Sequence, residues 1–211
     1  MDARAKHSPR RWNGDVQDRG EQHERKRLAI LHAAAALFNE KGYHGTTLDD
    51  LARRLHVTKP ALYYYVASKE DILVQCLEVA LGELRDGIAQ ARRDGRNGLE
   101  RLRIFVRHYV VLVVGDFGKC LVLSGSAAEG DRPHRTIVAG FRRVDAAART
   151  MLEEGVADGS IVAADPKIAA FALFGALHWI TRWYRSDGGL APDAIAERIF
   201  EVFEQGLRGG A

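Results

Sequence analysis

The chain of 211 residues has only two cysteines and no long apolar run, and both absences narrow what it can be. Cys76 and Cys120 do not have the spacing of a metal site, so we expect a reduced, cytoplasmic protein. The most apolar stretch, residues 104–114, is too short to span a bilayer and contains Arg107 and His108. The first residues are polar and lack the apolar core of a signal peptide. We therefore expect no membrane partner.

Catalytic motifs are also lacking. Residues 116–118 read Asp-Phe-Gly, as in a kinase metal motif, but no glycine loop, catalytic loop or strand accompanies them. The glycine at 115 does not begin a phosphate loop, because the spacing is short and Cys120 replaces the hydroxyl residue. The eight histidines are dispersed without metal spacing, and no nucleophile elbow is found. The sequence therefore predicts no enzyme, no cofactor and no metal site.

The net charge is only +3, but it is unevenly distributed. Between Arg25 and Lys69, eight basic residues face three acidic ones, so this part of the chain is strongly cationic. A basic block beside a mildly acidic remainder is typical of a nucleic-acid-binding module joined to a second domain. Solvated helix faces would explain the charge alone equally well, so the local pattern has to decide.

That local pattern lies between Thr46 and Leu73 and begins with a short helix. Thr46 and Thr47 form a capping pair, and two aspartates follow in the first turn, where carboxylates favour the positive end of a helix. Apolar residues then recur at helical spacing as far as Leu55, and His56 interrupts the pattern.

A second short helix follows the interruption. Thr58 can cap it, Lys59 and Pro60 occupy its first turn, and Ser68 caps the helix after that. Two short helices around a tight turn are the helix-turn-helix motif, whose second helix enters the major groove of DNA.

This stretch resembles the DNA-binding segment of the TetR family of bacterial transcriptional regulators. The residues that match the family pattern, in one order and spacing, are Phe38, Gly42, Tyr43, Thr46, Thr47, Leu51, Ala52, Val57, Thr58, Leu62, Tyr63, Tyr64, Ser68, Lys69, Glu70, Asp71 and Leu73. The chain departs from the pattern at Pro60, where glycine is common, and at Tyr65 and Val66, where histidine and phenylalanine are usual. These departures concern base preference and local packing.

The resemblance implies which residues contact DNA. The residues implied to contact phosphate are Thr46 or Thr47, Tyr63, Tyr64 and Lys69. Hydroxyls and a lysine near helix N-termini suit anionic oxygens, which agrees with this assignment. One of the three consecutive tyrosines must face inward, and we expect Tyr65 to do so together with Leu62.

Base edges are read at the start of the second helix and just before it. The candidates are Arg54, Thr58, Lys59, Pro60 and Ala61. A lysine here can donate to guanine, whereas proline and alanine can only touch a thymine methyl group. Simple surface solubility is the alternative explanation for Arg54.

The remainder of the chain predicts helices throughout, so the fold class is all-α. We expect a flexible N-terminal arm over 1–20, a three-helix helix-turn-helix DNA-binding domain over 21–68, and a helical bundle over 69–211. About nine helices are expected. Besides the two short helices of the helix-turn-helix motif, they include helices at 21–41, 69–93, 99–114, 132–154, 166–184 and 192–207. Residues 115–132 are glycine-rich and should be irregular, apart from a short helix near 119–124.

The C-terminal end carries a second resemblance. Residues 174–207 resemble the end of a TetR subgroup, several members of which respond to acyl-CoA thioesters in fatty-acid or steroid breakdown. In the family the last two helices pack against their copies in a second subunit, so the resemblance implies a homodimer. The residues for which core packing or dimer contact remain alternatives to ligand binding are Phe171, Phe174, Leu177, Trp179 and Trp183.

Family members bind ligands inside this bundle, so the resemblance implies an apolar cavity there. The candidate lining residues are Val106, Tyr109, Val110, Val113, Phe117, Phe141, Val144, Trp179, Arg182 and Trp183. Acyl-CoA phosphates would lie near a cation such as Arg182, Arg185, Arg142 or Arg143, and the irregular segment 115–132 would form the mouth. Aromatic and other lipophilic molecules are the alternatives to an acyl-CoA.

The sequence thus predicts a DNA-binding transcriptional regulator. We expect a repressor that binds a palindromic operator as a homodimer and is released by a small lipophilic effector such as an acyl-CoA. An effector-independent or architectural DNA-binding protein is the alternative.

Overall fold

The computed structural model describes residues 12–124, 131–162 and 165–207. Within these ranges the chain forms nine helices and no strand, which confirms the predicted all-α fold. The helices are α1 (Trp12–Gly45), α2 (Leu48–Leu55), α3 (Lys59–Tyr63), α4 (Lys69–Asp94), α5 (Gly98–Val114), α6 (Asp116–Ser124), α7 (Asp131–Asp158), α8 (Pro166–Trp183) and α9 (Pro192–Leu207).

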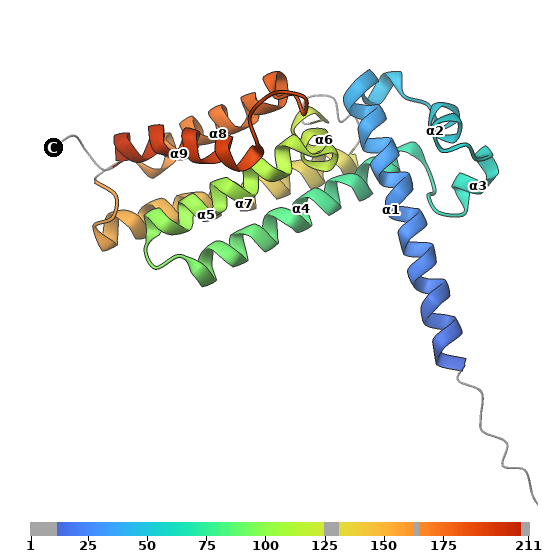
Figure 1. The fold of residues 1–211 in the computed structure, drawn as a ribbon, viewed down its shortest axis with the longest axis horizontal. Coiled ribbons are helices and arrows are strands. Elements are labelled where there is room, and N and C mark those ends of the chain that lie inside the picture. The colour runs from blue at the N-terminus through green and yellow to red at the C-terminus, as the bar shows by residue number, and fades with distance from the viewer. Residues whose placement is uncertain (1–11, 125–130, 163–164, 208–211) are drawn as a thin grey trace, which may run out of the picture.

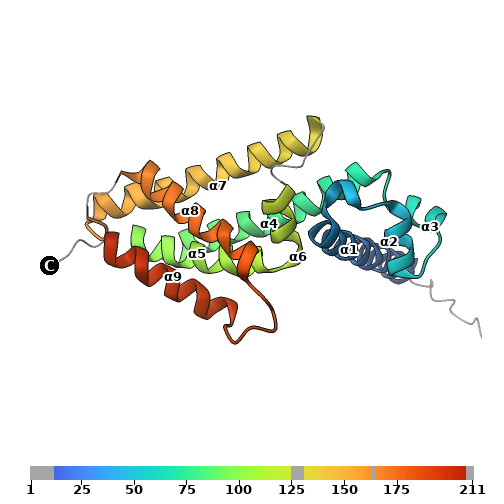
Figure 2. The same cartoon turned by 90° about the horizontal axis from the view of Figure 1, so that it is seen from above.

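The molecule is elongated, with α2 and α3 at one end and the bundle of α5, α7, α8 and α9 at the other (Figures 1 and 2). The helix α4 runs from the first group into the bundle, where it packs on α5, α6 and α7 as well as on α1. One continuous apolar core extends from Leu31 of α1 through Ile72 of α4 to Phe105 of α5, all of them fully buried. The two ends are therefore mechanically connected through packed side chains.

The helix α1 is longer than the sequence predicted. It begins at Trp12 rather than near residue 21, so the prediction of a flexible arm over 1–20 is wrong from residue 12 onward, and residues 1–11 lie outside the described part of the chain. Lengthening an existing helix needs no new nucleus, so residues without an apolar stripe can still continue it. At its other end the helix is interrupted at Gly42, whose φ of 75° and ψ of 160° suit glycine, as predicted.

The segment after α5 is more regular than predicted. Residues 116–124 form the helix α6, and its Phe117, Cys120 and Leu121 are buried; residues 125–130 lie outside the described ranges. A Cβ atom at residue 118 would lie 2.2 Å from the carbonyl oxygen of Leu112, so only glycine allows α6 to pack this closely on the end of α5. The glycine that suggested irregular structure thus serves close helix packing instead.

Candidate functional site

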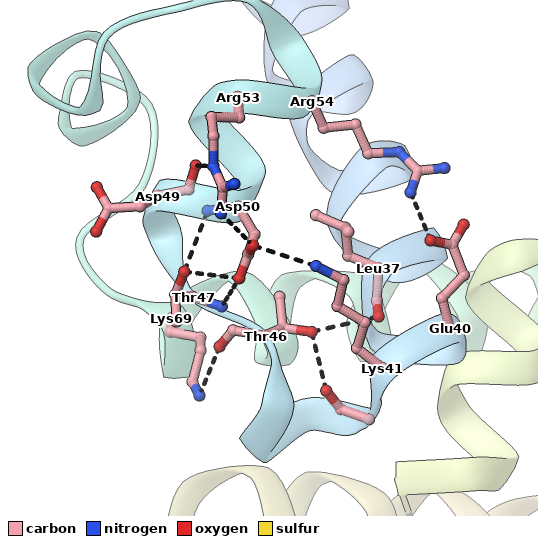
Figure 3. Close-up of polar contacts among 11 residues, drawn as sticks. Leu37, Glu40, Lys41, Thr46, Thr47, Asp49, Asp50, Arg53, Arg54 and Lys69 are labelled. Carbon is pink, nitrogen blue, oxygen red and sulfur yellow. Dashed lines mark hydrogen bonds and ion pairs between the residues drawn. The ribbon is translucent and has the colours of Figure 1, made fainter.

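The first candidate surface is built by α2 and α3, and its local structure is determined by a capping box. The backbone N–H of Asp50 donates to the Thr47 hydroxyl at 3.1 Å, and the backbone N–H of Thr47 donates to the Asp50 carboxylate at 3.0 Å (Figure 3). The Thr47 hydroxyl also donates to the Asp50 carboxylate at 2.7 Å, and this bond, followed by the one from the Thr47 backbone N–H, lowers the pKa of Asp50 to about 2. The start of α2 is therefore fixed by two reciprocal bonds.

The turn between the two helices depends on a left-handed residue. His56 has a φ of 54°, and the next backbone N–H, that of Val57, donates to the carbonyl of Ala52 at 3.0 Å. This closes α2 and reverses the chain toward α3. Thr58 occupies the cap position of α3 as predicted, but its side chain makes no capping hydrogen bond.

The helix α3 presents most of the predicted DNA-contacting residues to solvent. Thr58, Lys59, Pro60 and Ala61 are all exposed on its first turn. The rings of Tyr63 and Tyr64 are 52% and 73% exposed, which is unusual for large apolar groups without a partner. On the inner side, Leu62 is fully buried and Tyr65 is half-buried against the core, in agreement with the orientation expected for them.

The cations of this surface are each held by a neighbouring acid. Lys59 lies 3.1 Å from Asp49, and Arg54 lies 2.7 Å from Glu40 of α1. The hydrogen bond from Arg54 lowers the pKa of Glu40. Exposed ion pairs of this kind contribute little to stability, so a phosphate group can displace the acid at small cost.

Two of the residues predicted to contact phosphate have structural roles instead. Thr46 is buried, and its hydroxyl lies within hydrogen-bonding distance of the carbonyl oxygens of Leu37 and Gly42, so the prediction that it contacts phosphate is wrong (Figure 3). The ammonium group of Lys69 donates to the carbonyls of Tyr43 and Thr46, each at 3.0 Å. That lysine holds the loop before α2, and only its remaining N–H is available to DNA.

The sequence did not identify a contribution from α1 to this surface. The ring of His23 lies 4.8 Å from that of Tyr65 and 5.5 Å from that of Tyr64, measured between centroids. The long helix α1 therefore packs against the exposed Tyr64 through the ring of His23. No local pattern indicates this contact, because it joins residues about forty positions apart.

The second candidate site is a groove of about 430 Å³ between α7 and α8. Its walls are mainly apolar and aromatic, formed by Ile137, Val138, Phe141, Arg142, Val144, Asp145, Phe171, Phe174 and His178. Along α8 the contributing residues recur every three or four positions, so they share the side that faces α7. A volume of this size and character suits the body of a small lipophilic ligand.

One polar pair lies at the base of the groove. The hydroxyl of Tyr109 on α5 lies 2.7 Å from Nε2 of His178, and the two rings are stacked with centroids 5.9 Å apart. Phe141 and Phe174 pack on the same imidazole at 5.5 and 6.0 Å. Burial lowers the pKa of His178 and raises that of Tyr109, so both groups are neutral near pH 7.

A larger hollow of about 800 Å³ lies between α5 and α9, but its lining differs. Asn97, Glu100, Arg103 and Glu204 line it, and the guanidinium of Arg103 is paired with Glu204. Charged walls of this kind do not suit a lipophilic ligand. The α7–α8 groove is therefore the better candidate for an effector.

Only part of the predicted ligand-binding set lines this groove. Phe141 and Val144 do, and Tyr109 reaches it through His178. The predicted residues that are instead packed into the core, away from the groove lining, are Val106, Val110, Val113 and Phe117. Their prediction rested on an apolar stripe, which marks buried positions without separating core from cavity wall.

Three predicted ligand residues on α8 are also placed differently. Trp179 and Trp183 are 65% and 44% exposed, and Arg182 is exposed as well. None of the three lines the α7–α8 groove. Trp179 and Trp183 lie one helical turn apart, on the same outward side as the exposed Ile168, and form an apolar stripe on α8.

The two sites are joined by α4 and by contacts between α1 and α6. The His32 ring of α1 packs on Phe117 of α6 with centroids 4.3 Å apart, and the Asn39 side chain donates to the Asp116 carbonyl at 2.9 Å.

No helix in the described ranges is long and apolar enough to cross a membrane, and the residues described there hold no cluster fit for a metal ion.

A family model described as bacterial regulatory proteins, tetR family, matches residues 30–76. A second, described as tetracyclin repressor-like, C-terminal domain, matches residues 95–207, which is more than half of the chain. The matched segments contain the two candidate sites.

Individual relatives cover nearly the whole chain. The HTH-type transcriptional repressor KstR2 of Rhodococcus jostii (strain RHA1) is 29% identical over 196 residues, covering 86% of this chain and 91% of the relative. The fatty acid metabolism regulator protein of Bacillus subtilis (strain 168) is 23% identical over 188 residues, covering 86% and 95%. A solved structure of AibR in complex with isovaleryl coenzyme A and operator DNA has a TM-score of 0.74 at 26% identity, covering 83% and 96%. These relatives are regulators and not enzymes, as the sequence predicted.

Proposed function

Because the chain belongs to the TetR family of bacterial transcriptional regulators, we propose that it is a repressor that a small lipophilic effector releases from DNA. The observation that carries this proposal is the presence in one chain of an exposed helix α3 and an apolar groove, joined by α4. A DNA-binding role places the protein in the bacterial cytoplasm.

DNA binding requires two copies of the chain. One recognition helix covers too few base pairs for a specific site, so two are needed, about 34–36 Å apart or a multiple of that distance. The exposed tryptophans of α8, together with Val202 of α9 at 71% exposure, supply an apolar face through which two copies can pair. A twofold dimer of this kind binds a nearly palindromic operator.

The α7–α8 groove is the site where we place the effector. Its apolar walls suit an acyl chain, and the exposed Arg142 at the rim can meet a phosphate of coenzyme A. The names of the relatives support an acyl-CoA, because one regulates fatty acid metabolism and another was solved with isovaleryl coenzyme A. We therefore propose an acyl-CoA as the effector.

Release follows if the filled groove favours an arrangement in which the two α3 helices no longer match successive major grooves. The effector must bind that arrangement more tightly, since equal affinity for both would release nothing. The helix α4 and the α1–α6 contacts are the connections that can transmit the change.

The test begins with selection of the operator from a randomised duplex pool. Enrichment of a near palindrome, followed by its release on addition of isovaleryl-CoA or octanoyl-CoA, is the expected result. Binding that no thioester or uncharged lipophile alters would favour an effector-independent DNA-binding protein. Failure to enrich any sequence would contradict the proposed DNA-binding role itself.

A further inference from the structure

The polar pair at the base of the α7–α8 groove determines its own protonation pattern. Tyr109 is 1% exposed, and among the described residues its hydroxyl has one hydrogen-bond partner, Nε2 of His178 at 2.7 Å. A buried hydroxyl hydrogen needs an acceptor, so the tyrosine donates and Nε2 accepts. A neutral imidazole that accepts through Nε2 carries its proton on Nδ1.

The Nδ1–H group of His178 is therefore a hydrogen-bond donor that needs an acceptor. No atom of the described chain accepts a hydrogen bond from it, not even a carbonyl of the preceding turn of α8. The imidazole lines the groove, and its other ring neighbours are the aromatic faces of Phe141 and Phe174. Apart from Arg142 and Asp145, the lining of the groove is apolar and aromatic, so the Nδ1–H of His178 suits an apolar ligand that carries an acceptor on its hydrocarbon body.

We propose that His178 determines the specificity of the groove by donating its Nδ1–H to a carbonyl oxygen of an apolar ligand, such as a thioester or ketone. Tyr109 is the positioning residue, because its hydroxyl fixes the tautomer that makes Nδ1 a donor. This inference rests on the proposed function, since it assigns the effector to the same groove.

The consequence is discrimination by one oxygen atom. A ligand with the same hydrocarbon body but no carbonyl leaves the Nδ1–H unpaired when the groove closes over it. The unpaired donor makes such a ligand bind roughly 5- to 150-fold more weakly.

The test compares octanoyl-CoA with S-octyl-CoA, in which a methylene group replaces the thioester carbonyl. Calorimetry on the full-length protein should show the thioester binding more tightly by the factor above. His178→Phe should bind both compounds equally, and His178→Gln, which restores an N–H donor, should recover part of the preference. Tyr109→Phe should weaken the preference without abolishing it, because Nδ1 then carries the proton only part of the time.

A matched control is His134→Phe, the same chemical change at an exposed residue of α7 outside the groove, which should leave the preference unchanged. Melting temperatures of all variants confirm that they are folded. Equal binding of both compounds by the wild type, or an unchanged preference in His178→Phe, would overturn the inference while leaving the proposed function intact. Binding of neither compound would overturn the acyl-CoA class and this inference with it.

Discussion

The two candidate sites lie in different parts of one molecule, and their side chains differ in charge and polarity. At the α3 end, Lys59 and Arg54 are exposed cations, each held by a neighbouring acid, beside the exposed tyrosines of α3. At the groove, aromatic rings surround one uncharged hydrogen-bonded pair, Tyr109 and His178. The first end should therefore respond strongly to salt, and the second to the shape of a ligand and to its acceptor atoms.

The difference in charge between the two sites matches the two ligands proposed for them, which are DNA and a lipophilic effector. Exposed cations are concentrated on the first surface, whereas Arg142 and Asp145 are the charged residues among the nine that line the groove. The elements between them, α4 and the α1–α6 contact, belong to both packing environments. Perturbing each end separately should show how independent the two are.

The largest effect should come from breaking the pairing face, which removes DNA binding without touching α3. Changing both Trp179→Glu and Trp183→Glu places charges in the exposed apolar stripe of α8 and should give monomers. Operator affinity should fall about 10³-fold or more, to the level of non-specific binding. Sedimentation and gel shift measure the two effects, and effector binding by monomers would remain measurable.

The control for that pair is Val111→Glu, an equally drastic change at a 48%-exposed apolar residue of α5. It should leave a dimer. Sedimentation of the unmodified protein as a monomer at micromolar concentration would remove the basis for the proposed pairing.

A smaller effect should come from one cation at the start of α3. Lys59→Ala should weaken operator binding by about 1–3 kcal/mol and relax discrimination at one base pair, if this lysine donates to a base. Binding of octanoyl-CoA should not change. Lys167→Ala, at an exposed lysine at the start of α8, is the matched control. Equal DNA binding by both variants would remove Lys59 from the recognition surface.

The capping box of α2 should make the DNA-binding end sensitive to acid. Because Asp50 has a pKa of about 2 in the folded chain, against 3.8 ordinarily, its stabilising effect is complete above pH 4 and is lost as the pH falls toward 2. Asp50→Asn should therefore lower the melting temperature at pH 7, and the deficit should shrink at pH 3. A deficit that stayed constant over this range would show that the carboxylate charge is not responsible.

The smallest effect should come from the turn between α2 and α3. His56 adopts a φ of 54°, which costs roughly 1–2 kcal/mol in a residue with a Cβ atom. Glycine removes that cost but loses more entropy on folding, by roughly 0.5–1 kcal/mol. His56→Gly should thus change the free energy of unfolding by about 1 kcal/mol or less, measured by urea denaturation. A loss well above that would indicate that the imidazole itself makes a stabilising contact.

Prediction from sequence succeeded where neighbours in the chain determine the structure. The cap at Thr47, the end of α2 at His56 and the cap position of α3 at Thr58 are decided within three or four residues, and all are present. The same locality explains why the exposed and buried sides of α3 were predicted.

Prediction failed where distant segments meet. Lys69 was predicted to contact phosphate, but its ammonium group donates to the carbonyls of Tyr43 and Thr46, which only the folded chain brings within reach. The groove lies between α7 and α8, and its His178 bonds to Tyr109 of α5. That histidine was not identified because a single histidine in an apolar helix has no local pattern. Trp179 was predicted to line the cavity because the hydrophobicity of a residue does not show which side of its helix faces the interior.

The proposed function requires that ligand binding at the groove and operator binding are coupled in one molecule. Reciprocal titration measures this coupling directly. Operator affinity is measured with and without saturating octanoyl-CoA, and octanoyl-CoA affinity with and without operator. We expect each ligand to lower the binding affinity of the other by the same factor, typically about 5- to 150-fold for coupled sites. An operator affinity that stays unchanged while octanoyl-CoA is bound would contradict it.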